Sequence, residues 1–256
     1  MERHGPVAWI WLNRPEIHNA FDAALIADLT DAYENLGRDA GVRAILLAAR
    51  GKSFSAGAQI QWMKQQGAAS QEENAADARR LANLFATIAE CPKPTLARVQ
   101  GAAFGGGIGL LTACDIAIGT TEAVFATSEV RLGLIPAVIA PYVVRAIGER
   151  QARRLFQTGE RIDAATAERI GLLHETVQPE HLDARIRVVI EALLAGAPLA
   201  QREAKQLITS IADRPVTADL IEETAQRIAA RRAHAEAVEG LSAFLEKRPA
   251  EWTPRK

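Results

Sequence analysis

The chain has 256 residues, of which 48% are hydrophobic, and its 30 basic and 31 acidic residues give a formal net charge of −1. A chain of this length can bury a substantial core. Its near-neutral charge argues against the basic surface that a nucleic-acid or anionic-membrane binder needs. The two cysteines, Cys91 and Cys114, are read as reduced thiols rather than as a disulfide framework.

The longest run without a charged residue covers residues 99–114 and contains several glycines. It is shorter than a membrane-spanning helix requires. The first residues show no apolar segment followed by a small-residue cleavage site. We therefore expect no membrane association and a cytoplasmic location.

Alternating apolar residues predict a strand over 7–13, followed by a loop. Residues 22–36 carry apolar side chains at helical spacing, with Asp22 as the expected N-cap. A buried strand is expected over 43–49. A glycine-containing loop follows it, and a further helix begins near Ala58.

The next predicted helix is amphipathic, covers 77–90 and is stopped by a proline-containing segment. A strand over 95–101 leads into a glycine-rich stretch and a short helix that reaches Ala113. Two short strands are expected over 115–120 and 123–127. Strands that alternate with helices in this way favour a layered α/β fold.

The pattern becomes helical throughout from about residue 180, with breaks at Pro198 and Pro215. We therefore predict two parts. The first is an α/β core over 1–190 that carries the functional site, and the second is a helical C-terminal subdomain over 191–256.

The glycine-rich stretch "GAAFGGGIGL" (101–110) lies between apolar segments, where bare backbone is costly to order. It does not fit a dinucleotide-binding fingerprint, because the sixth position is Leu110 counted from Gly105 and Thr112 counted from Gly107. It also lacks the Gly-Lys-Ser/Thr ending of a P-loop. Nucleotide phosphates are therefore poor candidates for its ligand.

Two turns, "SAGAQ" (55–59) and "FGGGIG" (104–109), each follow a buried strand and precede a helix. Backbone N–H groups at a helix start are unpaired and face whatever lies in front of them. If the two turns converge, two N–H groups can bind one oxyanion. Either turn alone favours close packing of a helix on a strand, and only the pair of turns together with a nearby acid favours the oxyanion site.

Glu129 lies in "AVFATSEVRLGLIP" (123–136), after a strand and before an apolar segment. A carboxylate among apolar neighbours has a raised pKa, which suits it to exchange protons near neutral pH. The alternative is a surface glutamate paired with Arg131.

Three segments together resemble the enoyl-CoA hydratase/isomerase, or crotonase, family. They are "FSAGAQIQWM" (54–63), "VQGAAFGGGIGLLTACDIAIGT" (99–120) and "FATSEVRLGLIPA" (125–137). The similarity extends over nearly the whole chain, through "LNRPEIHNAF", "QTGERIDAATAERIGLLHE" and "GLSAFLEKR". The resemblance implies an α/β, crotonase-like spiral of ββα turns, a C-terminal helical region used for a homo-trimer or hexamer, and an acyl-CoA thioester substrate.

The resemblance also implies the roles of particular residues. The backbone N–H groups of Ala58 and Gly106 match the two oxyanion-hole donors, and Glu129 matches a catalytic glutamate. The residues that match substrate-contacting positions are His18, Ala20, Ala56, Gln59, Ile60, Gln61, Gly105, Gly109, Phe244 and Lys247. The last two match residues that in relatives reach the CoA of a neighbouring subunit.

The chain departs from the family pattern at two positions. Many family hydratases have a second catalytic glutamate, and its position here is Gly109, which has no side chain. Gln59 stands where aspartate is usual, and we expect that change to affect loop structure more than chemistry.

"SEVRLGLIPAVIAPYVV" (128–144) together with Gly109 resembles the methylglutaconyl-CoA hydratase branch, which is associated with leucine degradation. The expected activity is reversible hydration of a branched 2-enoyl-CoA such as 3-methylglutaconyl-CoA. We expect the bare position 109 to leave room for the branch or for a substrate carboxylate. The alternatives are a Δ3,Δ2-enoyl-CoA isomerase, which needs one base, and decarboxylation of a glutaconyl-type substrate.

A non-catalytic, RNA-binding relative is a different class of protein. It would need a basic surface bearing aromatic residues, which the balanced charge and 5% aromatic content disfavour. The five histidines show no metal-ligand spacing. We therefore expect no metal and no cofactor beyond the CoA that the substrate carries.

Overall fold

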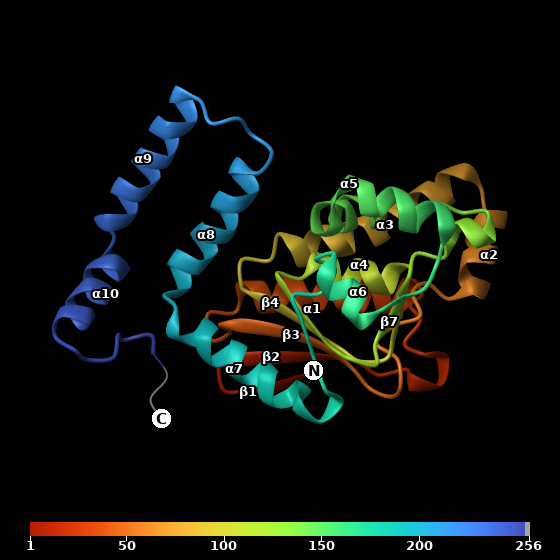
Figure 1. Ribbon diagram of the computed structural model, residues 1–256, viewed down its shortest axis with the longest axis horizontal. Coiled ribbons are helices and arrows are strands. Elements are labelled where there is room, and N and C mark those ends of the chain that lie inside the picture. Colours follow the sequence, from red (N-terminus) through yellow and green to blue (C-terminus); the bar gives the residue numbers. More distant parts are fainter. Residues whose placement is uncertain (254–256) are drawn as a thin grey trace.

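The computed structural model describes residues 1–253 as an α/β core from which three C-terminal helices extend to one side (Figure 1). In the same view α2 (Ile60–Ala68) lies at the opposite end of the core. None of the helices in the described residues is both long and apolar enough to cross a membrane.

The larger sheet has the strand order β1-β2-β3-β4-β6-β9. The β1 strand pairs antiparallel with β2, and the other neighbours are parallel. The strands are Glu2–His4 (β1), Val7–Leu12 (β2), Ala44–Ala49 (β3), Thr95–Val99 (β4), Ile116–Thr120 (β6) and Glu175–Val177 (β9). Parallel strands point their carboxyl ends to one edge, so the loops after β3 and β4 lie side by side.

A smaller sheet has the order β5-β7-β8 and carries the glycine-rich turn. Its strands are Ala102–Phe104 (β5), Val124–Ala126 (β7) and Ile162–Asp163 (β8). The β5 strand is parallel to β7, so the chain leaves both strands in the same direction. This arrangement brings the segment after β5 close to the segment after β7.

Within residues 1–253, seven helices belong to the core and three more form the extension. They are Ala23–Arg38 (α1), α2, Gln71–Ala89 (α3), Gly106–Ala113 (α4), Ala140–Thr158 (α5), Ala164–Arg169 (α6), Leu182–Ala195 (α7), Pro198–Ile211 (α8), Ala218–Arg232 (α9) and Ala235–Leu245 (α10). Short 3₁₀ turns cover Pro15–Ile17, Glu129–Leu132 and Pro179–His181.

The larger sheet is buried on both faces, which explains the uninterrupted apolar sequence of β3. One face contributes Ile45 and Leu47 to a core shared with helices α1, α3 and α4. The other face contributes Ala44 and Leu46 to a second cluster with α7. Side chains alternate between the two faces because successive strand residues point in opposite directions.

Most predicted elements agree with the structure to within a few residues. The Asp22 side chain caps α1 by accepting a hydrogen bond from the Leu25 N–H at 3.0 Å. Helix α3 begins at Gln71, earlier than the predicted residue 77, because Ser70 and Glu73 form a reciprocal capping box. The β5 strand lies where the sequence predicted only a glycine loop.

The C-terminal arm, defined here as α8–α10, exposes large apolar side chains. They include Ile208, Ile221, Leu241, Phe244 and Leu245, the last two about four-fifths exposed at 82% and 79%. Helix α7 packs on the sheet as far as Leu194, so the predicted boundary after residue 190 falls within this helix. The division into two domains stays a prediction.

Candidate active site

Two backbone turns meet at the carboxyl edge of the parallel strands. The Ser55 N–H donates to the Ala102 carbonyl at 3.1 Å, and the Phe104 N–H donates to the Ser55 carbonyl at 2.9 Å. Gly57 has φ +80°, and a Cβ there would lie 2.6 Å from the Phe104 oxygen and 3.0 Å from the Gly106 nitrogen. The two turns therefore pack so closely that position 57 must be glycine.

The backbone N–H groups of Ala58 and Gly106 are left free by this packing. The backbone of Phe21 bonds to the residues on either side of Ala58 and not to Ala58 itself. The Phe21 N–H donates to the Gly57 carbonyl, and the Gln59 N–H donates to the Phe21 carbonyl, each at 2.9 Å. Gly106 is the first residue of α4, where no helical acceptor exists. Neither N–H has an acceptor within the described residues.

Glu129 follows β7 and opens a 3₁₀ turn beside these two groups. Its Oε1 lies 3.0 Å from where a Cβ would stand on Gly105, so only the bare backbone leaves room for the carboxylate. Its Oε2 is buried and has no hydrogen-bond partner in the described part of the chain. Burial raises the pKa of Glu129 above its usual value, although a backbone hydrogen bond opposes the shift.

Ala58, Gly106 and Glu129 line one cavity of about 460 Å³. Its walls come from α2, α3 and the segment that leads into α5. The remaining lining residues are Phe21, Trp62, Met63, Gln66, Gly67, Asn74, Asp77, Ala78, Leu81, Leu134, Ile135, Pro136, Ala137, Val138 and Ile139. A mostly apolar cavity with two free N–H groups and one proton-exchanging carboxylate can hold a carbonyl compound and move a proton next to it.

The structure does not leave the expected room at Gly109. A Cβ at this position would overlap Ile139 Cγ2 and lie 2.8 Å from the Phe85 ring. Gly109 is buried and is not among the residues that line the cavity. Neighbouring hydrophobic side chains occupy the space of the absent glutamate, so the expectation of space for a substrate branch or carboxylate there is wrong.

Several other predicted substrate-contacting residues lie around the turns but outside the cavity wall. They are His18, Ala20, Ala56, Gln59, Ile60, Gln61 and Gly105. The His18 Nδ1 lies 3.0 Å from Ser53 Oγ, and its ring is exposed. Ile60 is 68% exposed at the start of α2. Their contacts with CoA stay a prediction, as do those of Phe244 and Lys247 at the end of the arm.

Sequence reasoning missed Trp62, Gln66, Asn74 and Asp77, which form part of the cavity wall. A signal was present, since Trp62 and Gln66 are four residues apart on α2 and Asn74 and Asp77 are three apart on α3. It could not be used without knowing that α3 starts at Gln71.

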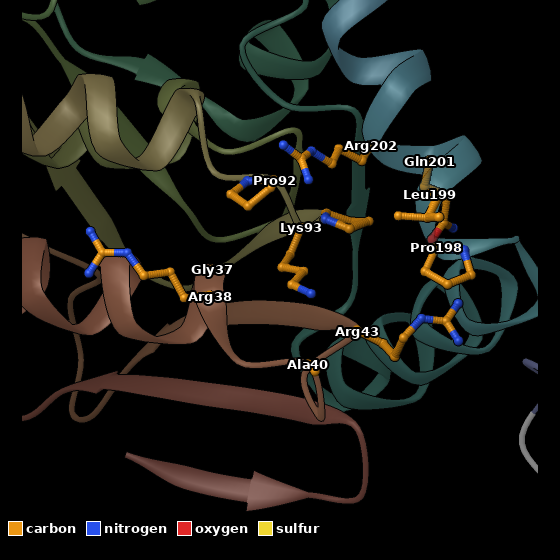
Figure 2. A pocket seen from close by; sticks show the side chains of 11 residues that line it. Gly37, Arg38, Ala40, Arg43, Pro92, Lys93, Pro198, Leu199, Gln201 and Arg202 are labelled. Atoms are coloured by element: carbon orange, nitrogen blue, oxygen red, sulfur yellow. The ribbon is translucent and has the colours of Figure 1, made fainter. Parts of the chain in front are cut away.

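A second cavity, of about 450 Å³, lies at the opposite edge of the sheet, between the amino ends of β3 and β4 and the start of α8 (Figure 2). Four basic side chains line it: Arg38, Arg43, Lys93 and Arg202. Arg43 donates to the carbonyls of Gly196 and Trp252, which ties the C-terminal part to the core. This cavity contains none of the free N–H groups or the glutamate described above.

The family model for enoyl-CoA hydratase/isomerase matches residues 2–255. The chain is 44% identical in sequence to an enoyl-CoA hydratase from Shewanella pealeana. The crystal structure of that protein matches this fold with a TM-score of 0.94, over 97% of this chain and 93% of that one. An enoyl-CoA hydratase/isomerase from Marinobacter aquaeolei is 32% identical with a TM-score of 0.93, over 99% and 98%. A crotonyl-CoA hydratase of Syntrophomonas wolfei is 32% identical over 257 residues, which cover 98% of this chain and 95% of the relative.

Fold and site together define a protein of the crotonase fold with a cavity lined by Ala58, Gly106 and Glu129. The chain belongs to the enoyl-CoA hydratase/isomerase family. The resemblance and the spiral α/β fold predicted from the sequence are thereby confirmed.

Proposed function

We propose that the protein is an enoyl-CoA hydratase that adds water reversibly across the 2,3 double bond of a 2-enoyl-CoA thioester. The observation that carries the proposal is that Ala58 and Gly106, whose backbone N–H groups have no acceptor in the described residues, line the same cavity as Glu129. The relatives named enoyl-CoA and crotonyl-CoA hydratase support it.

In this reaction the thioester oxygen accepts hydrogen bonds from the Ala58 and Gly106 N–H groups. When the oxygen of water bonds to C3, the electron pair of the double bond moves through C2 to the thioester oxygen as an enolate. The two N–H groups stabilise that charge, and the loss of one such donor typically costs about 3 kcal/mol. Both donors are backbone groups held by close packing, so they need no reorganisation.

Glu129 serves as base and then as acid in turn. Its carboxylate takes a proton from water while the hydroxyl oxygen bonds to C3, and the resulting carboxylic acid gives that proton to C2. A raised pKa suits this double role, because the group must both gain and lose a proton near neutral pH. The reaction requires no cofactor apart from the CoA of the substrate.

We further propose a branched acyl group, with 3-methylglutaconyl-CoA as the first candidate, on the strength of the 128–144 resemblance. The apolar wall from Leu134 to Ile139 supports a branched hydrocarbon portion. Room for the branch comes from the cavity itself and not from position 109.

The single glutamate also supports Δ3,Δ2-enoyl-CoA isomerisation, in which one base moves a proton between C4 and C2. Incubation with 2-enoyl- and 3-enoyl-CoA, with products identified by mass, tests the proposal. A 3-hydroxyacyl product from the 2-enoyl thioester is expected. Formation of only the isomeric enoyl thioester would replace the hydratase proposal with the isomerase.

We also propose that the chain forms a homo-trimer or a hexamer through the C-terminal arm. The exposed apolar side chains of α9 and α10 support this, since single chains seldom leave such a surface uncovered. In that assembly Phe244 and Lys247 would reach the CoA bound by a neighbouring copy.

A further inference from the structure

Phe21 contacts both halves of the proposed oxyanion hole, although it supplies neither of the two N–H groups. It lies between the first 3₁₀ turn and α1, and its side chain is completely buried. The proposed hydration chemistry does not use this side chain. Its contacts nevertheless reach the backbone on either side of Ala58 and the first residue of α4.

The backbone of Phe21 orients Ala58. The two residues form an isolated parallel bridge, in which Phe21 bonds to Gly57 and Gln59 and not to Ala58 itself. In such a parallel pairing, the peptide groups of the bracketed residue point to the side away from its partner strand. The bridge therefore turns the Ala58 N–H away from Phe21.

The segment that leads into Phe21 also holds the rest of the turn before α2. The Ala56 N–H donates to the His18 carbonyl at 2.9 Å. The Ser55 Oγ donates to the Asn19 carbonyl at 2.9 Å and accepts from the Gly57 N–H at 3.1 Å. These bonds fix the backbone before the free N–H group, and the bond between Gln59 and the Phe21 carbonyl fixes the backbone after it.

The ring of Phe21 contacts Gly106. A Cβ on Gly106 would lie 2.2 Å from Cζ of the ring and 3.1 Å from each Cε, so the tip of the ring rests against the start of α4. Gly106 does not have a positive φ, so the ring and not the backbone conformation excludes a side chain there. Because protein interiors are close-packed, the ring fixes how near the start of α4 can come to Phe21.

We infer that Phe21 is a positioning residue of the oxyanion hole. Its backbone sets the direction of the Ala58 N–H, and its ring sets the position of the Gly106 N–H. Donors held in advance at the place where negative charge develops need no reorganisation during the reaction. The inference rests on the proposed function, in which the thioester oxygen binds these two groups.

Phe21→Leu keeps the backbone pairing and removes the tip of the ring. We expect kcat for hydration of 2-hexenoyl-CoA to fall by about 10- to 10²-fold, because the Gly106 N–H is no longer held in place. KM should change less, since the remaining contacts of the substrate are kept. The matched control is Phe85→Leu, which removes an equally buried ring that contacts Gly109 and Tyr142. If both variants lower kcat by the same factor, Phe21 acts only in packing and the inference fails.

Gly106→Ala tests the same contact from the other side. The added methyl group overlaps the Phe21 ring and should lower kcat. In the double variant with Phe21→Leu the methyl group has room, so kcat should exceed that of Gly106→Ala by about tenfold, a non-additive effect expected of residues in contact. A double variant whose loss equals the product of the two single losses would contradict the inference.

The carbonyl stretching frequency of bound hexanoyl-CoA separates this inference from the proposed function. Hexanoyl-CoA has no double bond to hydrate, so its thioester carbonyl reports the hydrogen bonds alone. In infrared difference spectra the frequency should be lower in the parent protein than in solution, and Phe21→Leu should shift it back towards the solution value. An identical frequency in both proteins, lowered from that in solution, would overturn the inference and leave the proposed function intact. A parent protein that leaves the solution frequency unchanged would instead remove the oxyanion hole, and with it the proposed function.

Discussion

Glu129 combines two features that are uncommon for a glutamate: an oxygen without a partner and a position against bare glycine backbone. Glu129→Gln keeps the shape but cannot exchange a proton. We expect kcat to fall by about 10²- to 10⁴-fold. Steady-state hydration assays check this, with the exposed Glu122→Gln as control. Near-normal turnover would remove Glu129 as the acid–base group.

The raised pKa of Glu129 also predicts a pH-dependent cost in stability. Since burial raises the pKa of Glu129 in the folded state, folding favours the protonated carboxyl group. The stability that this group contributes is present at low pH and is lost as the pH rises through the folded-state pKa. The ionised carboxylate therefore destabilises the protein at neutral pH. Glu129→Gln should raise the free energy of unfolding at pH 8 by about 1 kcal/mol.

Below about pH 4 the parent glutamate is protonated in both states, so the gain from Glu129→Gln should vanish. Thermal unfolding at the two pH values measures the difference. A variant that is less stable than the parent at pH 8 would show that the carboxylate is better satisfied than the structure indicates.

At the scale of elements, the site depends on the contact between the turn before α2 and the turn before α4. Gly57→Ala would place a methyl group 2.6 Å from the Phe104 oxygen and force the turns apart. Because about 1 Å of misplacement can cost on the order of 10² in rate, kcat should fall by roughly that factor. Gly5→Ala is the matched control, since Gly5 also has positive φ but faces open space. Equal effects of the two substitutions on kcat would argue against a packed oxyanion hole.

Helix α4 carries the position of the absent second glutamate. Gly109→Glu would have to displace Ile139 and Phe85, so it should lower the melting temperature and reduce turnover of straight and branched substrates alike. Adding Ile139→Ala should restore part of the stability by emptying the space. A stable Gly109→Glu protein impaired only with branched substrates would instead place position 109 next to the acyl group.

The two turns and Glu129 were predictable because each belongs to a local strand–turn–helix pattern. The order of these segments in the chain matched a known family, which placed them at one site. The part of the cavity lining that α2 and α3 supply was not predictable, because Trp62 and Asp77 line the same cavity only after these helices have packed into place. The filled space at Gly109 likewise depends on Phe85 and Ile139, which belong to other parts of the fold.

At the scale of the whole molecule, the three helices of the arm are joined to one another by hydrogen bonds and an ion pair. The Glu236 carboxylate accepts hydrogen bonds from the Leu199 and Ala200 N–H groups at 2.9 Å each and pairs with Arg231. It therefore joins the start of α8 to α9 and α10. An arm whose helices are joined in this way and present apolar side chains is suited to receive other copies of the chain.

The assembly prediction concerns Leu241 and Leu245, which are 59% and 79% exposed on α10. Replacing both with aspartate should convert the proposed trimer or hexamer into monomers, because a charge buried in an apolar interface without a partner is costly. Light scattering measures the mass. Val188→Asp, 52% exposed on α7, is the matched control and should leave the assembly intact.

If the arm also completes the CoA site of a neighbour, the monomers should show a raised KM with a smaller change in kcat, since Ala58, Gly106 and Glu129 belong to one chain. A monomeric parent protein would contradict the proposed assembly, and an unchanged KM in the monomers would contradict the role of the arm in CoA binding.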